Sequence, residues 1–306
     1  MNILELIRQK GTETEILRRL ETLKSATSMR YNEITRNGEY FSTYQKAITS
    51  FFDQVKLAGI KHPLVQQYSP VKCYILVTTD MGFMGGVNAK VIEKYNEITR
   101  ENQDSTTRRV VLGEKGAKTL DDALIEYEFF QGLADEEKEI KAKVTEIKDY
   151  IISEALQQKL GLAQIIYPYS KSFYHQDIKV TTLLPCEAIE SLSKPECETY
   201  RRRTLVDSSF NELAENLIGY WFESKLCEVF KDCKLAEYSA RYIHLDGSVN
   251  RSKERLKQIT KKIVGLQRMK QNQGILVSQS AAKLNRKRRL MRDKKEGFSM
   301  IPIVEF

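Results

Sequence analysis

Both ends of the chain carry long stretches with helical periodicity, and these constrain the fold more than any other feature. Residues 3–58 place apolar side chains at three- and four-residue steps with Arg, Glu and Lys between them, and the first proline is Pro63. Pro63 ends the helix, because the residue before a proline is pushed out of the helical region. A helix of this length extends about 80 Å, more than a compact domain requires. It therefore needs a partner that covers its apolar stripe.

The C-terminal third has the same character. The sequence has helical periodicity from about residue 208 to about residue 295, and its second half contains an apolar seam with the steps typical of a coiled coil. The seam consists of Leu256, Ile259, Ile263 and Leu266. Since each end of the chain has a long helix without another partner, we predict that the two helices pair as an antiparallel coiled coil.

The middle of the chain has a different pattern. Short apolar runs typical of buried strands alternate with helical segments between about residues 68 and 200. The predicted strands are 71–79, 109–112, 163–167 and 178–184, and the predicted helices are 88–99 and most of 121–160. This alternation predicts an α/β fold, with a small open, Rossmann-like domain inserted between the two long helices. The predicted division is a coiled coil of residues 1–60 and 205–295, an α/β domain of residues 65–204 and a tail of residues 296–306.

The net charge of +8 is concentrated near the C-terminus. The thirteen residues 283–295, called the basic block below, hold eight cations against Asp293 alone. The cations are Lys283, Arg286, Lys287, Arg288, Arg289, Arg292, Lys294 and Lys295. Such a block usually binds an acidic partner, which can be nucleic acid, anionic lipid or an acidic protein loop. The alternative is a solvated helix end that binds nothing.

The cysteines and the hydropathy indicate the compartment. Five cysteines are an odd number, and they lack the spacing of a metal site, so we expect reduced thiols that lie mostly in the core. They are Cys73, Cys186, Cys197, Cys227 and Cys233. No stretch approaches the roughly 20 apolar residues that cross a bilayer, and the first residues do not resemble a signal peptide. We therefore expect a cytoplasmic protein without a membrane span.

Candidate catalytic and ligand-binding motifs are weak. The glycine-rich turn 82–86 follows the first strand, but it matches neither GxGxxG nor GxxxxGK[ST]. Residues 113–119 resemble a phosphate-binding loop only superficially, because the segment is one residue too short. The histidines His62, His175 and His244 have no paired spacing. We therefore expect no catalytic, cofactor or metal site in this chain.

Four motifs together resemble the gamma subunit of F-type rotary ATPases. Residues 77–88 look like that family's signature, a strand followed by Ser/Thr-Asp-Arg-Gly-Leu-Cys-Gly-Gly, a hydrophobic residue and Asn. His62-Pro63 matches a His-Pro pair upstream of the signature, and residues 111–116 are similar to the next strand and its turn. The fourth motif, at the start of the C-terminal helix, comprises Tyr220, Glu223, Leu226, Glu228, Ala236, Glu237, Ala240, Arg241 and Asn250. The resemblance spans about residues 5–285.

This resemblance implies a central rotor shaft that has no catalytic activity of its own and binds no cofactor. The family's gamma subunit turns inside a hexamer of three alpha and three beta subunits, which binds ATP, ADP and Mg. Its α/β domain, the foot domain, lies beside an epsilon subunit and a membrane rotor ring. That implies a cytoplasmic location, peripheral to the inner face of the plasma membrane.

The resemblance also nominates site residues. The signature turn of the foot domain contributes Asp80, Gly82, Gly85, Gly86 and Asn88. The predicted contacts with the hexamer are Lys24, Arg268, Lys270 and Gln271. In the tail, the candidate residues are Arg286, Lys287, Arg288, Arg289 and Arg292.

The chain also departs from the family. Met81 and Met84 replace the Arg and the Cys of the signature, and about twenty residues continue past the family's usual end. These departures favour a divergent paralogue, whose output can differ from proton transport. Two alternatives from other classes stay open. One is a nucleic-acid-binding protein that uses the basic block, and the other is an enzyme that uses the α/β domain.

Overall fold

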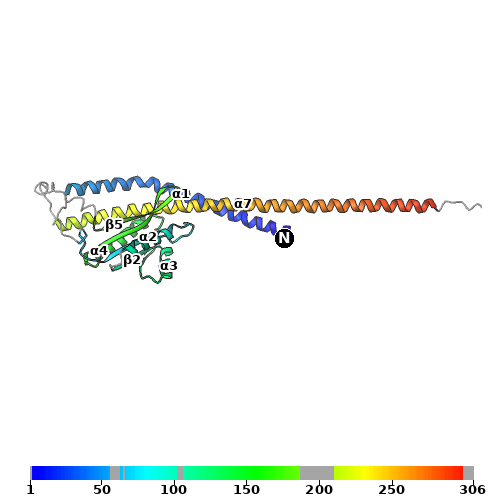
Figure 1. Cartoon of the computed structure of the whole chain (residues 1–306). Coiled ribbons are helices and arrows are strands. Elements are labelled where there is room, and N and C mark those ends of the chain that lie inside the picture. The colour runs from blue at the N-terminus through cyan, green and yellow to red at the C-terminus, as the bar shows by residue number, and fades with distance from the viewer. Residues whose placement is uncertain (1, 56–62, 65, 102–105, 187–209, 299–306) are drawn as a thin grey trace, which may run out of the picture. The chain divides into compact units, whose positions relative to one another are not determined.

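The computed structural model describes residues 2–55, 63–64, 66–101, 106–186 and 210–298 (Figure 1). The predictions for His62 and Cys197, and the exact end of the first helix beyond Val55, lie outside the described residues. The helices are α1 (Ile3–Val55), α2 (Val87–Glu101), α3 (Glu114–Asp122), α4 (Glu137–Leu156) and α7 (Phe210–Phe298). The strands are β1 (Lys72–Val77), β2 (Thr107–Leu112), β3 (Glu128–Phe130), β4 (Leu162–Ser172) and β5 (His175–Leu184).

The chain divides into two compact units. One unit comprises Thr22–Gly247, and the other comprises Met1–Glu21 together with Ser248–Phe306. The boundaries cut through α1 and α7, so each unit contains a part of both long helices. The finer division into coiled coil, α/β domain and tail remains a prediction.

The larger unit contains a five-stranded sheet in the order β3-β2-β1-β4-β5. Strands β3, β2, β1 and β4 are parallel, and β5 pairs antiparallel with β4. The central strand β1 is buried on both faces, which is why its sequence reads as a continuous apolar run. The predicted open, mainly parallel sheet is confirmed.

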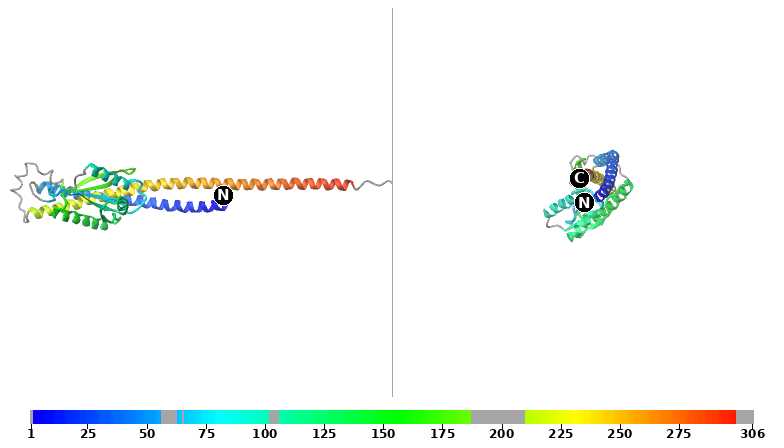
Figure 2. Two further views of the ribbon diagram at one scale, coloured as in Figure 1. Left: turned by 60° about the horizontal axis from the view of Figure 1, so that its bottom comes forward. Right: turned by 90° about the vertical axis from the view of Figure 1, so that its right-hand side faces the viewer.

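Helices cover both faces of this sheet. Cys73, Ile75 and Val77 face a core that includes α4 and the first part of α7, with Ile147 and Phe230 among its members. The alternate residues of β1, Tyr74 and Leu76, face a second core that α2 and α3 complete. Strands β4 and β5 run beside the first part of α7, as the views of Figures 1 and 2 show. The first part of α7, from Leu217 to Cys233, is therefore also a wall of the α/β domain.

The two long helices pair antiparallel in each unit. In the larger unit Lys24 of α1 pairs with Asp246 of α7, and Arg30 and Ile34 line a groove with Cys227 of α7. In the smaller unit, the Ser252 hydroxyl donates to the Glu13 carboxylate at 2.7 Å, and the earlier residues Glu5 to Thr12 lie near Ile259. Later residues of α1 thus face earlier residues of α7 within each unit. This confirms the predicted pairing of the terminal helices.

The predicted helix over most of 121–160 is wrong in its first part. Helix α3 ends at Asp122, where Leu124 adopts a positive φ of 54° and its amide N–H bonds the Asp121 carbonyl. Residues 128–130 then form the edge strand β3, which pairs with Val110–Leu112 of β2. A three-residue strand has no periodicity to detect, and its partner strand defines it. Only α4 corresponds to the predicted helix.

Candidate functional site: the signature turn and the shaft helices

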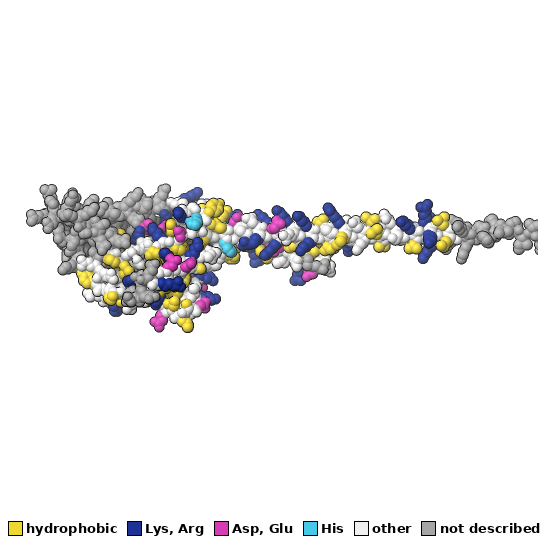
Figure 3. Space-filling view, in the orientation of Figure 1, with side chains coloured by type: hydrophobic (Ala, Val, Ile, Leu, Met, Phe, Trp, Pro, Cys, Tyr) yellow, Lys and Arg dark blue, Asp and Glu magenta, His cyan; other side chains and the backbone are white. Residues whose placement is uncertain are grey.

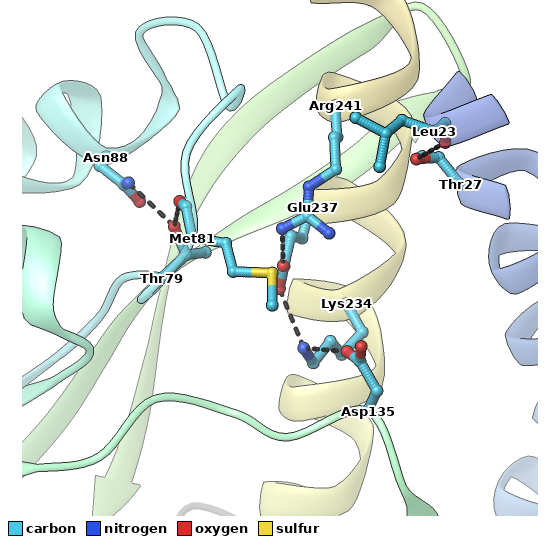
Figure 4. A network of polar contacts seen from close by, with 9 residues as sticks. All are labelled: Leu23, Thr27, Thr79, Met81, Asn88, Asp135, Lys234, Glu237 and Arg241. Atoms are coloured by element: carbon cyan, nitrogen blue, oxygen red, sulfur yellow. Dashed lines mark hydrogen bonds and ion pairs between the residues drawn. The ribbon is translucent and has the colours of Figure 1, made fainter. Parts of the chain in front are cut away.

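Hydrogen bonds fix the signature turn between β1 and α2. The Asn88 side-chain amide donates to the Thr79 hydroxyl at 3.0 Å, and that hydroxyl donates to the Met81 carbonyl at 3.1 Å (Figure 4). Gly85 adopts a φ of 59°, in the left-handed region that glycine enters without strain. The structure therefore brings the predicted turn residues together as one ordered element.

Asp80 connects this turn to helix α3. Its carboxylate accepts a hydrogen bond from the backbone N–H of Glu114 at 2.8 Å, at the first residue of α3. A Cβ atom on Gly132 would lie 2.6 Å from the same carboxylate, so the loop before α4 closes over it. A helix N-terminus is where phosphate groups bind in nucleotide-binding proteins. Here the protein's own carboxylate occupies that position.

The backbone that follows β1 also lies close to the start of α3. Gly113 has a φ of 96°, and a Cβ atom there would lie 2.6 Å from the Thr78 carbonyl oxygen. The Thr78 hydroxyl accepts from the Gly116 N–H at 3.0 Å. Contacts within the chain therefore satisfy the amides of residues 113–119 that a phosphate would use. The amides of Gly113 to Gly116 are thus already hydrogen-bonded within the chain, to Phe130, Asp80, Thr79 and Thr78 in that order.

Removing the Asp80 carboxylate should weaken this connection. We expect Asp80→Ala to lower the free energy of unfolding by about 1 kcal/mol, because α3 loses a side-chain cap and a charge that interacts favourably with its N-terminus. Chemical denaturation of the full chain, followed by circular dichroism, measures the change. Asp122→Ala removes an exposed carboxylate at the other end of α3 and should change stability little. Equal effects of the two changes would contradict the capping role.

A buried network of charges connects α7 with the loop before α4. The Lys234 ammonium lies 2.9 Å from the Asp135 carboxylate and 3.1 Å from the Glu237 carboxylate (Figure 4). Arg241 pairs with the other oxygen of Glu237 at 2.5 Å. Lys234 and Glu237 are 2% and 6% exposed, so these charges are almost completely removed from water. A buried charge has lost its hydration, so it is strongly destabilising unless an opposite charge lies beside it. These charges therefore depend on one another.

The environment of this network changes two pKa values. Burial alone would raise the pKa of Asp135, but the neighbouring Tyr238 hydroxyl and Lys234 ammonium outweigh it, and the pKa is lowered. Burial, and then the Asp135 carboxylate, raise the pKa of Tyr238. Asp135 is therefore ionised and Tyr238 neutral at physiological pH. Neither of these two groups is therefore poised to exchange a proton near neutral pH.

Met81 lies close to this network. A groove of about 470 Å³ is lined by Met81, Arg241 and Tyr238. Residues of α1, including Leu23 and Arg30, complete its wall. The Met81 side chain is 61% exposed and supplies no charge to Glu237. Lys234 and Arg241 compensate that carboxylate from within α7 itself.

Sequence analysis missed Asp135 and Lys234. The spacing of Lys234, Glu237 and Arg241, at steps of three and four on a helix, could have indicated that the three charges share one face. Nothing in the sequence pointed to Asp135, which is 99 residues away from Lys234.

The predicted hexamer contacts fall in two places. Lys24 belongs to the larger unit, where Asp246 binds its ammonium and raises its pKa, and the ammonium lies 5.0 Å from the centre of the Tyr242 ring. Arg268, Lys270 and Gln271 belong to the smaller unit and are exposed on α7. Figure 3 shows Lys and Arg side chains recurring along the surface of the long helix. Of these four residues, Lys24 is the one engaged within its own unit by an ion pair.

The candidate residues of the tail lie on the last part of α7. Arg286, Lys287, Arg288 and Arg289 are exposed on the helix, and the side chain of Arg292 is outside the described residues. The predicted tail 296–306 begins inside the helix, which continues to Phe298.

The cysteines of the described residues are buried thiols. Cys73, Cys186, Cys227 and Cys233 are not in disulfides, and burial raises the pKa of Cys73 to about 12. The described residues contain no group of three or more His, Cys, Asp or Glu side chains that could hold a metal ion. Within the same part of the chain, no helix combines the length and the apolar character needed to cross a bilayer.

The described residues form a long antiparallel helix pair that carries a five-stranded α/β sheet, and this fold matches chains of solved ATP synthase structures. One chain of the Euglena gracilis mitochondrial ATP synthase, from a structure of OSCP, F1 and the c-ring, matches with a TM-score of 0.58 and 12% identity. The match covers 99% of this chain and 98% of that one. A chain of the Tetrahymena thermophila central stalk and c-ring gives a TM-score of 0.57 at 14% identity, over 75% of this chain and 98% of that one.

Sequence comparison gives the family. The profile of a family described as ATP synthase matches residues 9–273, and the chain belongs to that family. The ATP synthase gamma chain of Pelotomaculum thermopropionicum is 26% identical over 223 residues, which cover 71% of this chain and 75% of the relative. The gamma chain of Helicobacter acinonychis is 25% identical over 273 residues, which cover 82% and 87% of the two chains. The relatives that resemble this chain are thus gamma chains.

Proposed function

We propose that this chain is the central rotor shaft of an F-type or F-type-like rotary ATPase, and that it catalyses no reaction itself. In this proposal a hexamer of alpha and beta type binds ATP and Mg, and the shaft connects its catalytic cycle to rotation. The observation that carries the proposal is the antiparallel pairing of α1 and α7 in both units, with the α/β sheet packed on α7. The family membership supports it.

The packing suits a part that transmits torque. Helix α7 has 89 residues, about 130 Å at the rise of an α-helix. Within the larger unit, Phe222 and Phe230 of α7 are completely buried against the sheet, so a turn of the helix must also move the sheet. In the smaller unit, Leu6 of α1 and Ile263 of α7 are both buried, as expected for the interface of a helix pair. Two packed helices resist twisting better than one.

The charges suggest how the shaft meets the hexamer. Arg268 and Lys270 are exposed cations on a part of α7 that contains no acidic residue. Attraction between such cations and acidic loops is long-ranged and only partly screened over about 10 Å, so it can act without tight interlocking. A shaft that turns against a ring needs this kind of contact, because interlocked surfaces would block each step.

The proposal also covers the cellular location of the chain and the process that its rotation drives. We infer a position in the cytoplasm at the inner face of the plasma membrane, where the foot domain would meet a small epsilon-type subunit and a membrane rotor ring. The replacement of the signature Arg by Met81 and the extension that holds the basic block favour a divergent paralogue, with an output that need not be proton transport.

Purification from the native host tests this function. The tagged chain should co-purify with a hexamer that hydrolyses ATP, and the isolated full chain should show no ATPase activity. We expect Arg268→Gln/Lys270→Gln to weaken the association on the order of fivefold, since rim charges contribute modestly each. Lys90→Gln/Lys115→Gln, exposed on α2 and α3, removes the same charge and serves as the control. A chain that is monomeric in gently lysed cells would contradict the proposal.

A further inference from the structure

The C-terminal part of α7 is a positively charged helix without carboxylates. The sequence has no Asp or Glu between Glu254 and Asp293. Residues 255–291 contain eleven Lys and Arg residues: Arg255, Lys257, Lys261, Lys262, Arg268, Lys270, Lys283, Arg286, Lys287, Arg288 and Arg289. Lys257, at the start of this part, lies 3.8 Å from Glu254, and earlier cations of the long helices also face acids, as Lys253 faces Glu21 at 2.8 Å. Beyond Lys257, no carboxylate within residues 255–291 compensates the charge of α7.

The repulsion is strongest in the basic block. Lys283 and Lys287 are four residues apart, and Arg286 and Arg289 are three apart, which are the spacings at which side chains on a helix are neighbours. Among the residues whose side chains the structure describes, none forms an ion pair with the five cations between residues 283 and 289. A lone helix with such spacing is destabilised by its own charge. An acidic partner would remove this repulsion.

Apolar side chains accompany these cations. Val277, Leu284 and Met291 are seven residues apart, so on a straight helix each points within about 20° of the one before it. These three side chains are 69%, 59% and 58% exposed. From residue 267 to residue 291 every side chain of α7 is exposed. An exposed apolar strip thus runs along α7 into the basic block.

The distribution of charge decides between the classes of acidic partner. Successive residues of an α-helix point about 100° apart, so the four consecutive cations from Arg286 to Arg289 point to every side of the helix. A bilayer surface or one groove of a duplex contacts a helix from one side. The phosphates of a duplex also give no cover to exposed apolar side chains such as Leu284 and Met291, and a bilayer that covered them would leave the cations on the opposite side of the helix unpaired. A folded protein can provide acidic groups on several sides and an apolar socket between them.

We propose that residues 283–291 bind an acidic protein surface that surrounds this part of α7. Carboxylates of the partner pair with Arg286, Lys287, Arg288 and Arg289, and an apolar socket receives Leu284 and Met291. This contact is separate from the hexamer contact of Arg268, Lys270 and Gln271, and it goes beyond the proposed function. It gives the basic block a role that the rotor shaft alone does not require.

Site-specific photocrosslinking in the native host tests the contact. The full chain carries p-benzoylphenylalanine in place of the exposed Asn285, and the crosslinked product is digested and sequenced by mass spectrometry. We expect a crosslink to a protein segment rich in Asp and Glu. In the variant Arg286→Gln/Lys287→Gln/Arg288→Gln/Arg289→Gln the yield should fall on the order of tenfold, because glutamine preserves the helix but removes the charge.

A matched variant and a second probe make the result interpretable. Lys90→Gln/Lys115→Gln/Lys118→Gln/Lys171→Gln removes four exposed cations from the α/β domain and should leave the crosslink at residue 285 unchanged. The same photoreactive residue at Gln271 reports the hexamer contact, so the proposed function can fail independently. A product at residue 285 that is sensitive to nuclease, contains lipid, or joins two copies of this chain would overturn the proposal. So would a protein crosslink that the four glutamines leave intact.

Discussion

Lys234→Met should lower the free energy of unfolding by about 3 kcal/mol. The change keeps the length of the side chain but removes the ammonium that pairs with Asp135 and Glu237. Removing one partner of a buried ion pair leaves an uncompensated charge, which is strongly destabilising. The expected loss is small for the removal of one partner from a buried ion pair, because Arg241 still pairs with Glu237 and the Asp135 side chain is 40% exposed. Urea denaturation of the full chain measures it.

Two controls separate the missing charge from a packing defect. Lys231→Met lies one turn earlier on α7 and removes a partly exposed cation, so it should change stability by less than about 0.5 kcal/mol. Adding Asp135→Asn to Lys234→Met should restore part of the loss, since Asp135 then carries no charge and Glu237 keeps its ion pair with Arg241. A double variant as unstable as Lys234→Met would show that packing, and not the charge opposite Asp135, was lost.

The same network should make the fold sensitive to acid. The folded-state pKa of Asp135 is lowered from its ordinary value of 3.8. A group with a lowered pKa contributes stability that is fully present above its unfolded-state value and is lost as the pH falls through the folded-state value. The stability difference between the wild type and Lys234→Met should therefore be constant near neutral pH and shrink below about pH 4.

Phe230→Ala should destabilise the larger unit by about 4 kcal/mol. The ring is completely buried in the core that α7 shares with β1, β4 and α4. Removing a large aromatic side chain from such a site loses its burial and leaves a cavity. The change also loosens the attachment of the sheet to α7, so ATP hydrolysis by the complex should become less coupled to movement of the foot domain.

Tyr220→Ala is the matched control for this prediction. Tyr220 lies on the same helix but is 53% exposed, and its loss should cost less than about 1 kcal/mol. Thermal and urea unfolding of the full chain compare the two variants. Similar losses for Phe230→Ala and Tyr220→Ala would contradict a core that includes α7.

Much of the fold could be predicted from local patterns. The apolar run of β1 indicated a strand buried on both faces, and the steps of the seam around Ile263 indicated a helix that needs a partner. These patterns are visible because each depends on neighbours within a few residues. The edge strand β3 was missed because its three residues become a strand only by pairing with β2.

The candidate site was less predictable for the same reason. The turn residues were found through a family signature, but the role of Asp80 depends on Glu114, which is 34 residues further along the chain. Lys24 was predicted to face a partner, whereas the fold gives it Asp246 at a separation of 222 residues. Periodicity cannot report such pairs, since it contains no information about which distant residues meet.

By itself, the sequence determined the two terminal helices, the inserted α/β domain and the family, because periodicity and short motifs are local properties. It also determined the charge of the basic block. Only the tertiary structure decided that α7 forms a wall of the α/β core, that the Asp80 carboxylate accepts from the first amide of α3, and that the buried Lys234 ammonium pairs with the partly exposed Asp135 carboxylate. These features arise where distant segments exclude water together, and burial then determines which charges must be compensated.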